Sequence, residues 1–449
     1  MNKVMKRRGG LLIALMTVLL LWAVQAQAVI EGISGTPGTP TFNLVAKQDF
    51  ISAPDGDSIL MWGYADGANR MQYPGPTLIV DEGDLVTVIL RNELPPAHGQ
   101  NVSIVFPGQV VDTSLSGTGA VDGALTKEAL PGGIIFVTYQ FEATHPGTYI
   151  YRSGTRPDLQ VEMVLVGALI VRPLGNPTLP DDRPHSPNLT LAYNHPDSAY
   201  HYEYLYLTTE VDVNIHRLVE DGRIAEVDTT TWFPVHWFVN GRAFPDLLQA
   251  PFHPFFPTQP YNCVPQTHPF EKILIRVIGA GRQQHPMHYH GADFSVIAAN
   301  GRMLSSDGGA AGPDLAWQAS TLNFTPGQTA DFLWEWKGEN IGWDVYGHAP
   351  GDPYETGYEA ENPGFDDHGQ PFPVILAERD DLAFGQFWSG SPFLGGTGDL
   401  PPDHPGLNSG GAYLFPWHSH SEKELTSNDV FPGGSLTFII LQHPTTPIP

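Results

Sequence analysis

The chain has 449 residues, and its 22 basic and 48 acidic side chains give a net charge of −26, which excludes a protein that binds nucleic acid through the phosphates. Its 48 glycines and 42 prolines indicate many turns, and its 41% hydrophobic content excludes a globally disordered chain. Because Cys263 is the single cysteine, an intramolecular disulfide and a cysteine-rich metal site are excluded as well.

The N-terminal segment has the pattern of an export signal. Basic residues at positions 3, 6, 7 and 8 precede an apolar run over 11–24, which ends in Ala26-Gln27-Ala28. The run is shorter than the roughly 18 apolar residues of a membrane anchor, so we expect no transmembrane segment. We predict a signal peptide over 1–28, cleaved after Ala28, and a periplasmic or extracellular protein. Cleavage removes four basic and no acidic residues, which leaves a net charge of −30.

The next part of the chain is typical of antiparallel β-structure. Short runs of Val, Ile, Leu, Thr and Tyr, such as 78–80, 85–90 and 134–141, alternate with Gly, Pro, Asn and Asp. This spacing indicates a sandwich or barrel, which we assign to a first domain over 29–175. A proline-rich stretch follows and predicts a linker over 176–188.

A second β-rich domain is predicted over 189–449. Its strand candidates are 237–242, 273–278, 294–298, 322–336 and 435–441. A Gly-, Pro- and Asp-rich stretch over 347–411 is too long for a loop of a compact sandwich, so we predict an insertion there. The sequence leaves open whether this insertion covers a pocket or contacts a partner.

Among the 18 histidines, two clusters stand out by their spacing. His288 and His290 are two residues apart, as are His418 and His420, so each pair lies on one face of an extended strand. If the two strands are neighbours, four imidazoles converge, and neutral imidazole is a ligand for copper, zinc, iron or nickel. The alternative is that these side chains only line a polar sheet face. The isolated Cys263 is expected to be a small buried cysteine or a loop cysteine.

Several segments resemble the multicopper oxidases. They are Tyr73-Pro-Gly-Pro-Thr-Leu-Ile-Val-Asp-Glu-Gly-Asp, Gly147-Thr-Tyr-Ile-Tyr, His285-Pro-Met-His-Tyr-His-Gly and His418-Ser-His. The resemblance implies an all-β protein of two Greek-key, cupredoxin-like β-sandwich domains. It also implies copper as cofactor and dioxygen as oxidant.

The family's ligand positions are only partly retained. By resemblance, His285 stands at a type 1 copper position, His288 at a type 2 position, and His290, His418 and His420 at type 3 positions. Ser419 stands where the family has the cysteine thiolate of the type 1 copper, and a hydroxyl cannot replace that thiolate. Glu424 stands where the second type 1 histidine is expected.

The first domain has lost all its ligands by the same comparison. Val105-Phe106-Pro107 and Arg152-Ser153-Gly154 occupy the positions of the family's two histidine motifs. We therefore expect one or two copper ions rather than four, and no laccase-type four-copper activity. Carboxylates that could orient the remaining imidazoles are expected at Asp293, Glu422 and Glu424.

The sequence thus favours an exported copper-binding protein with a reduced histidine site. Such a protein would be an oxidoreductase that acts with dioxygen on metal ions (Cu, Fe, Mn) or small phenols. The alternatives are a non-enzymatic protein that stores or delivers copper, and a metal-free structural cupredoxin module. The expected partner is a metal ion or a small molecule, and the sequence leaves a homo-oligomer open.

Overall fold

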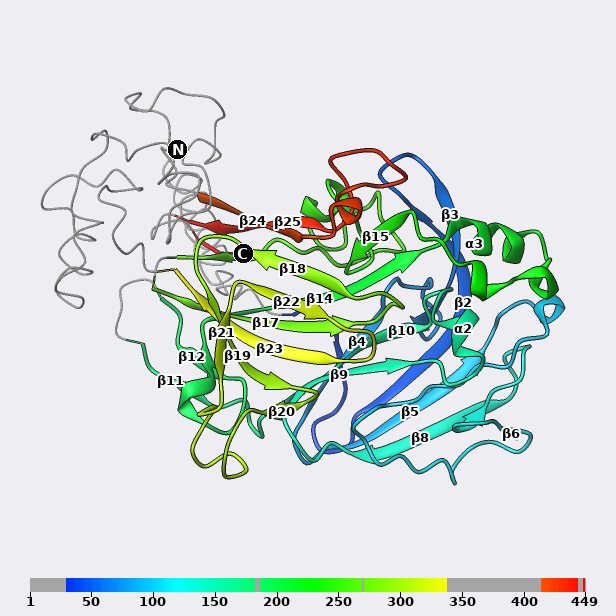
Figure 1. The fold of residues 1–449 in the computed structure, drawn as a ribbon. Coiled ribbons are helices and arrows are strands. Elements are labelled where there is room, and N and C mark those ends of the chain that lie inside the picture. The colour runs from blue at the N-terminus through cyan, green and yellow to red at the C-terminus, as the bar shows by residue number, and fades with distance from the viewer. Residues whose placement is uncertain (1–29, 182–185, 269, 337–412, 443–446, 449) are drawn as a thin grey trace, which may run out of the picture.

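The computed structural model describes residues 30–181, 186–268, 270–336, 413–442 and 447–448. Strands dominate these residues, and the all-β prediction is confirmed (Figure 1). In the described part of the chain no helix has the length and hydrophobicity needed to cross a membrane. The predicted signal peptide and the predicted 347–411 insertion lie outside the described residues.

Two four-stranded sheets, ordered β1-β4-β10-β9 and β3-β2-β5-β8, form the first sandwich. Alternation explains its core: in β5, Val86, Val88 and Leu90 are fully buried while the side chains between them are more exposed. The strands expected at 78–80, 85–90 and 134–141 are confirmed as β4, β5 and β8. The strands of this half are β1 (Ile33–Ser34), β2 (Thr41–Ser52), β3 (Ser58–Asp66), β4 (Gly75–Asp81), β5 (Leu85–Asn92), β6 (Val121–Asp122), β7 (Lys127–Glu128), β8 (Phe136–Glu142), β9 (Gly147–Arg152) and β10 (Val166–Arg172).

The second sandwich has one sheet ordered β15-β14-β17-β23-β19-β20, with β21 paired to β19, and one ordered β16-β25-β24-β18-β22. Its strands are β14 (Tyr202–Val211), β15 (His236–Val239), β16 (Gln266–Thr267), β17 (Lys272–Gly279), β18 (His285–Tyr289), β19 (Phe294–Ala299), β20 (Arg302–Met303), β21 (Trp317–Ala319), β22 (Thr321–Phe324), β23 (Thr329–Glu335), β24 (Tyr413–Ser419) and β25 (Leu436–Leu441). Between the sandwiches in sequence, β11 (Thr178–Leu179), β12 (Leu189–Leu191) and β13 (Ala199–Tyr200) form a small sheet.

In the described residues the helices are short and lie in the connections between strands. The α-helices are α2 (Pro157–Gln160) and α3 (Val213–Glu220), and the 3-10 turns are η1 (Pro96–His98), η2 (Pro196–Ser198), η3 (Ile224–Glu226), η4 (Thr229–Thr231), η5 (Asp246–Leu248) and η8 (Glu422–Leu425). Asp212 caps the N-terminus of α3 by accepting the Asn214 N–H. The helix buries Ile215 and Val219 in the core of the first sandwich, although it follows a strand of the second.

One predicted strand is wrong in its extent. The run 322–336 is divided into β22 and β23 by a turn in which Gly327 has φ +79°. The two strands belong to different sheets, because β22 pairs with β18 while β23 pairs with β17 and β19. The boundaries between the two domains stay a prediction, and within the expected linker residues 178–179 form β11.

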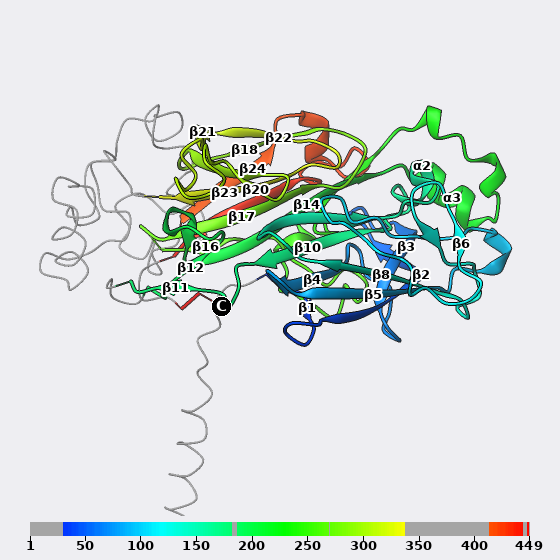
Figure 2. The same cartoon turned by 90° about the horizontal axis from the view of Figure 1, so that it is seen from below.

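The four sheets stack in layers, which Figure 2 shows from the side. The sheet with β18 and β24 is the layer furthest from the first sandwich, while β14 and β17 face β9 and β10. Apolar side chains fill this junction, among them Ile150 and Ile170 from the first sandwich and Leu205, Leu207 and Ile278 from the second. Burial of this kind stabilises the contact by about 25 cal/mol per Å² of apolar surface.

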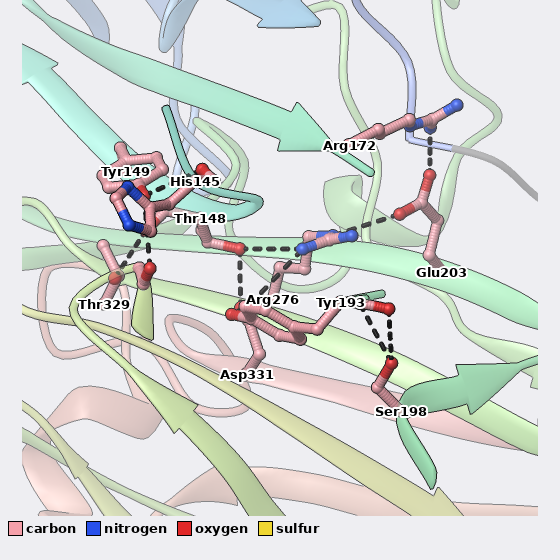
Figure 3. A network of polar contacts seen from close by, with 11 residues as sticks. His145, Thr148, Tyr149, Arg172, Tyr193, Ser198, Glu203, Arg276, Thr329 and Asp331 are labelled. Carbon is pink, nitrogen blue, oxygen red and sulfur yellow. Dashed lines mark hydrogen bonds and ion pairs between the residues drawn. The ribbon is translucent and has the colours of Figure 1, made fainter. Parts of the chain in front are cut away.

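A buried polar network crosses the same junction (Figure 3). Arg276 on β17 donates from Nε to Glu203 (3.1 Å) and from Nη1 to the Thr148 hydroxyl (3.2 Å) on β9. The same Nη1 lies 3.4 Å from a carboxylate oxygen of Asp331, which accepts the Thr148 hydroxyl at 2.6 Å on its other oxygen. Arg172 on β10 donates to the second oxygen of Glu203. Two guanidinium groups and two carboxylates therefore balance each other across the junction.

The charges in this network depend on one another. Burial raises the pKa of Glu203, but Arg172 and Arg276 outweigh this and hold it below its ordinary value. Burial raises the pKa of Asp331, and Arg276 offsets only part of that rise. Because Arg276 contacts both acids, it is the central cation of the network.

Replacing Arg276 by Ala should destabilise the protein strongly, because it leaves two carboxylates buried without their shared cation. We expect a loss of about 3–5 kcal/mol in the free energy of unfolding, measured by urea denaturation at neutral pH. The control is Arg223→Ala, which removes a half-exposed ion pair with Glu226 and should change stability little. Equal stability of the two variants would contradict the role assigned to Arg276.

Candidate metal centre

The two predicted histidine pairs lie on neighbouring strands. Strands β18 and β24 run antiparallel, with His288 opposite His418 and Met287 opposite Ser419. Met287 and Ser419 are fully buried, whereas the two histidines are half-buried on the other face of the sheet. The alternation expected from the sequence is therefore present, and this register places imidazoles from both strands side by side.

Backbone hydrogen bonds hold the other two histidines at the ends of the same strands. The N–H of His290 donates to the carbonyl of Pro416 (3.1 Å), and the N–H of His420 donates to the carbonyl of Pro286 (2.9 Å). Each histidine is thus tied to the opposite strand just beyond the paired residues.

The structure brings the four side chains together into a cluster that we call the histidine quartet: His288, His290, His418 and His420. The ring centroid of His288 lies 4.8 Å from that of His290 and 4.7 Å from that of His420. The rings of His418 lie 5.0 Å from His420 and 5.2 Å from His290. In the closest approach, the Nε2 atoms of His290 and His418 are 3.1 Å apart.

Hydrogen bonds at the outer nitrogens orient two of these rings. The Nδ1 of His418 lies 3.1 Å from the carbonyl oxygen of Ser419, which only accepts, so Nδ1 carries the proton. In the neutral ring the lone pair is then on Nε2, which faces His290. The Nδ1 of His288 lies 2.8 Å from the hydroxyl of Thr321 on β22. Partners of this type fix ring orientation in metal-binding histidines.

The protonation state of the quartet also favours the binding of a cation. Burial, followed by the proximity of the other three imidazoles, lowers the pKa of His288 to about 4. Burial likewise lowers the pKa of His418. Both rings are therefore neutral at pH 7 and keep a free lone pair. The side chain of His420 is 50% exposed, so the quartet is reached directly from solvent.

His285 is not part of the quartet. Its Nδ1 lies 2.9 Å from Glu424 and its Nε2 lies 3.0 Å from Glu210, and all three side chains are buried. Burial alone would lower the pKa of His285, but the hydrogen bonds to Glu210 and Glu424 outweigh it and raise the pKa to about 9. Both ring nitrogens are occupied by carboxylates, and these contacts argue against the ligand assignment predicted for His285.

This ion triad occupies the place where the sequence resemblance implied a type 1 copper. Glu424 comes from η8, and the fully buried Ser419 lies beside it with its hydroxyl accepting the N–H of Ser421. Glu210 on β14 completes the site, and its second oxygen accepts the N–H of Gln283 at 2.8 Å. At this place the described residues provide carboxylates that pair with an imidazolium. They do not form a soft ligand set for a metal.

The predicted loss of ligands in the first domain has a structural counterpart. Phe106 packs against the rings of Phe141 and Tyr151, with centroids 5.0 and 5.9 Å away. Ser153 donates its hydroxyl to Gln160 at 2.6 Å. These positions complete a hydrophobic core and a hydrogen-bonded turn, so they offer no imidazole to a metal.

Of the three acids expected near the imidazoles, Glu424 forms a hydrogen bond with a histidine, and sequence reasoning missed a fourth acid. Glu422 lies 4.0 Å from Nδ1 of His420, and Glu424 contacts His285, whereas Asp293 is exposed. Glu210 was missed because it belongs to no motif, and its strand β14 carries a second acid, Glu203, so that an acid in this strand is not distinctive. Cys263 is buried, as expected, and burial raises the pKa of its thiol well above the ordinary value.

The stability of the metal-free protein should depend on pH through His285. Its folded-state pKa of about 9 lies above the ordinary 6.5, so the triad's stabilisation is complete below pH 6.5 and is lost as pH rises through 9. Glu424→Gln removes one carboxylate and should move the His285 titration to lower pH, measured by NMR of the imidazole protons. Glu422→Gln, at a residue with a 79% exposed side chain, is the control and should leave it unchanged. A wild-type midpoint at or below 6.5 would refute the triad.

Comparisons with known proteins give matches in sequence. Residues 63–176 match the family model described as multicopper oxidase. The multicopper oxidase MCE of Talaromyces pinophilus is 37% identical over 157 residues, which are 33% of this chain and 23% of the relative. The copper-containing nitrite reductase of Pseudomonas chlororaphis is 27% identical over 143 residues, which are 31% of this chain and 35% of the relative. The matches thus span about a quarter to a third of these relatives' length.

Solved structures are similar over most of the chain. The multicopper oxidase mgLAC superposes with a TM-score of 0.52 at 18% identity, covering 91% of this chain and 87% of the other. A blue copper oxidase from Nitrosomonas europaea gives a TM-score of 0.51 at 18% identity, covering 89% and 85%. At this identity the likeness concerns the fold. The family model and the curated relatives match part of the chain to multicopper oxidases, and the solved multicopper oxidase structures share its fold.

Proposed function

We propose that the protein is an exported copper-binding oxidoreductase whose metal site is the histidine quartet. The observation that carries the proposal is the 3.1 Å approach of the Nε2 atoms of His290 and His418. Two imidazole nitrogens this close need a shared proton or a shared cation between them. Four imidazoles form a donor set that fits copper, which the family implies.

The quartet has enough donors for one copper ion, or for two with open positions, but not for four. Copper held by imidazoles supplies one-electron chemistry by changing between its +1 and +2 states. The chain's own part is to hold the ligands: Thr321 orients His288, and the Ser419 carbonyl fixes the protonated nitrogen of His418. The His285 triad lies apart from the quartet, and electrons from a substrate would have to enter at the quartet itself.

The surface charge and the open site narrow the substrate class. A mature chain with a net charge of −30 attracts cations and repels anions. The exposed side of His420 leaves room for direct contact with a small molecule. We therefore propose reduced metal ions (Cu, Fe or Mn) or small neutral phenols as substrates, with dioxygen as the oxidant.

The same exposure favours a second candidate function, a non-enzymatic protein that stores or delivers copper. A ligand set reached from solvent can pass its ion to a partner without any redox step. The two candidates differ in dioxygen consumption and agree on copper binding at the quartet.

The double variant His288→Ala/His420→Ala should lose most of its bound copper, because half of the imidazoles are removed. Copper per chain is measured by elemental analysis after loading and dialysis, with His145→Ala, at an exposed histidine, as the control. The wild-type protein should lack the intense blue absorption of a copper–thiolate bond, because serine stands at 419. An unchanged copper content per chain in the double variant would refute the proposal that the quartet binds copper.

Dioxygen uptake then separates the two functions in copper-loaded wild-type protein. An oxidoreductase should consume dioxygen with a phenol, Cu(I), Fe(II) or Mn(II), and the double variant should not. Copper binding without uptake on any of these substrates would leave copper storage or delivery as the function.

Export is part of the proposal and has its own test. Expressed from the full sequence in a bacterial host, the mature protein should begin at Val29, as measured by intact-mass analysis of the periplasmic fraction. Replacing Leu11–Leu15 by polar residues should keep the chain in the cytoplasm with residues 1–28 attached. A mature mass that includes residues 1–28 in the wild type would contradict cleavage.

A further inference from the structure

A second group of potential metal ligands lies away from the quartet, where the two sandwiches meet. Asp55 and Asp57 are in the turn between β2 and β3 of the first sandwich, and His236 is the first residue of β15 in the second. One oxygen or nitrogen from each of the three lies within 4.8 Å of the others. Figure 1 shows the β2–β3 hairpin reaching toward β15. Gly56 between the two acids has φ +92°, which suits the tight turn that brings both carboxylates to one side.

The residue that most strongly indicates a bound ligand is His236. Its side chain is fully buried, and neither Nδ1 nor Nε2 has a hydrogen-bond partner among the described residues. Nε2 faces Asp55 at 3.7 Å, which is too far for a hydrogen bond. An unpaired buried polar group costs about 1–3 kcal/mol.

The neighbours hold the two carboxylates in place. The side chain of Asp55 is only 9% exposed and accepts the Asn428 amide at 3.1 Å. Asn428 in turn donates its backbone N–H to the carbonyl of Val235, the residue before His236. Asp57 accepts Arg217 at 3.1 Å, and the side chain of Arg217 is 63% exposed. Two carboxylates and one guanidinium leave a net negative charge that a divalent cation would neutralise.

We propose that Asp55, Asp57 and His236 bind a divalent transition-metal ion of the zinc class, which clamps the β2–β3 hairpin onto β15. One imidazole and two carboxylates are a mixed nitrogen and oxygen donor set, which suits zinc better than the all-oxygen set of calcium. Three protein ligands leave a fourth position for water. Because the ligands come from both sandwiches, the ion stabilises their junction independently of the quartet.

The test uses the His288→Ala/His420→Ala protein, so that metal at the quartet does not contribute. Zn²⁺ binding is measured by isothermal titration calorimetry, and thermal unfolding is followed with and without Zn²⁺. We expect one bound Zn²⁺ per chain and a higher unfolding temperature with the metal. Ca²⁺ should bind more weakly. No Zn²⁺ binding, or a preference for Ca²⁺, would overturn the proposal.

Variants on the same background assign the ligands. Asp55→Asn and His236→Gln should each weaken Zn²⁺ binding by at least about tenfold, since even residues behind the ligands cost that much when removed. They should also abolish the rise in unfolding temperature. Asp122→Asn and His145→Gln change exposed residues of the same types and are the controls. If His236→Gln fails to fold, Asp55→Asn and Asp57→Asn decide, and unchanged affinity in both would refute the site. Failure of copper binding at the quartet would leave this result untouched.

Discussion

The register between β18 and β24 is the constraint on which the candidate centre depends. With His288 opposite His418, the inward side chains of both strands fill the core of the second sandwich, and the imidazoles share the outer face. A slip of one residue would bury the histidines and expose Met287 and Trp417. The hydrophobic core therefore fixes the geometry of the quartet, because a slip of the register would lose apolar contacts.

Much of this arrangement could be predicted because it follows from period-two alternation. The strands at 78–80, 85–90 and 134–141 and the common face of each histidine pair need only local information. The partners of His285 could not be predicted, since Glu210 lies 75 residues away and carries no motif. The division of 322–336 was missed although Pro326-Gly327 between the two halves is a turn signal, and the structure places the halves in different sheets. His236 belongs to no motif in the sequence, and only the fold brings it beside the two acids of the β2–β3 turn.

Charge pairing holds strands together at two buried positions of the protein. An imidazolium between Glu210 and Glu424 ties β18, β14 and η8 together. Arg276 with Glu203 and Asp331 does the same across the junction of the two sandwiches. Both groups are buried, and each cation contacts two carboxylates, so each group would tolerate the loss of a single partner poorly.

The stacking order of the sheets bears on how such a chain could change over time. The layer with the quartet lies on the side away from the first sandwich, and β22 and the last residue of β24 supply the hydrogen-bond partners that orient His288 and His418. Substitutions at Phe106 or Ser153 therefore act on a different core. Substitutions in the core of the first sandwich can therefore accumulate without altering the packing behind the quartet, since the two cores share no residue.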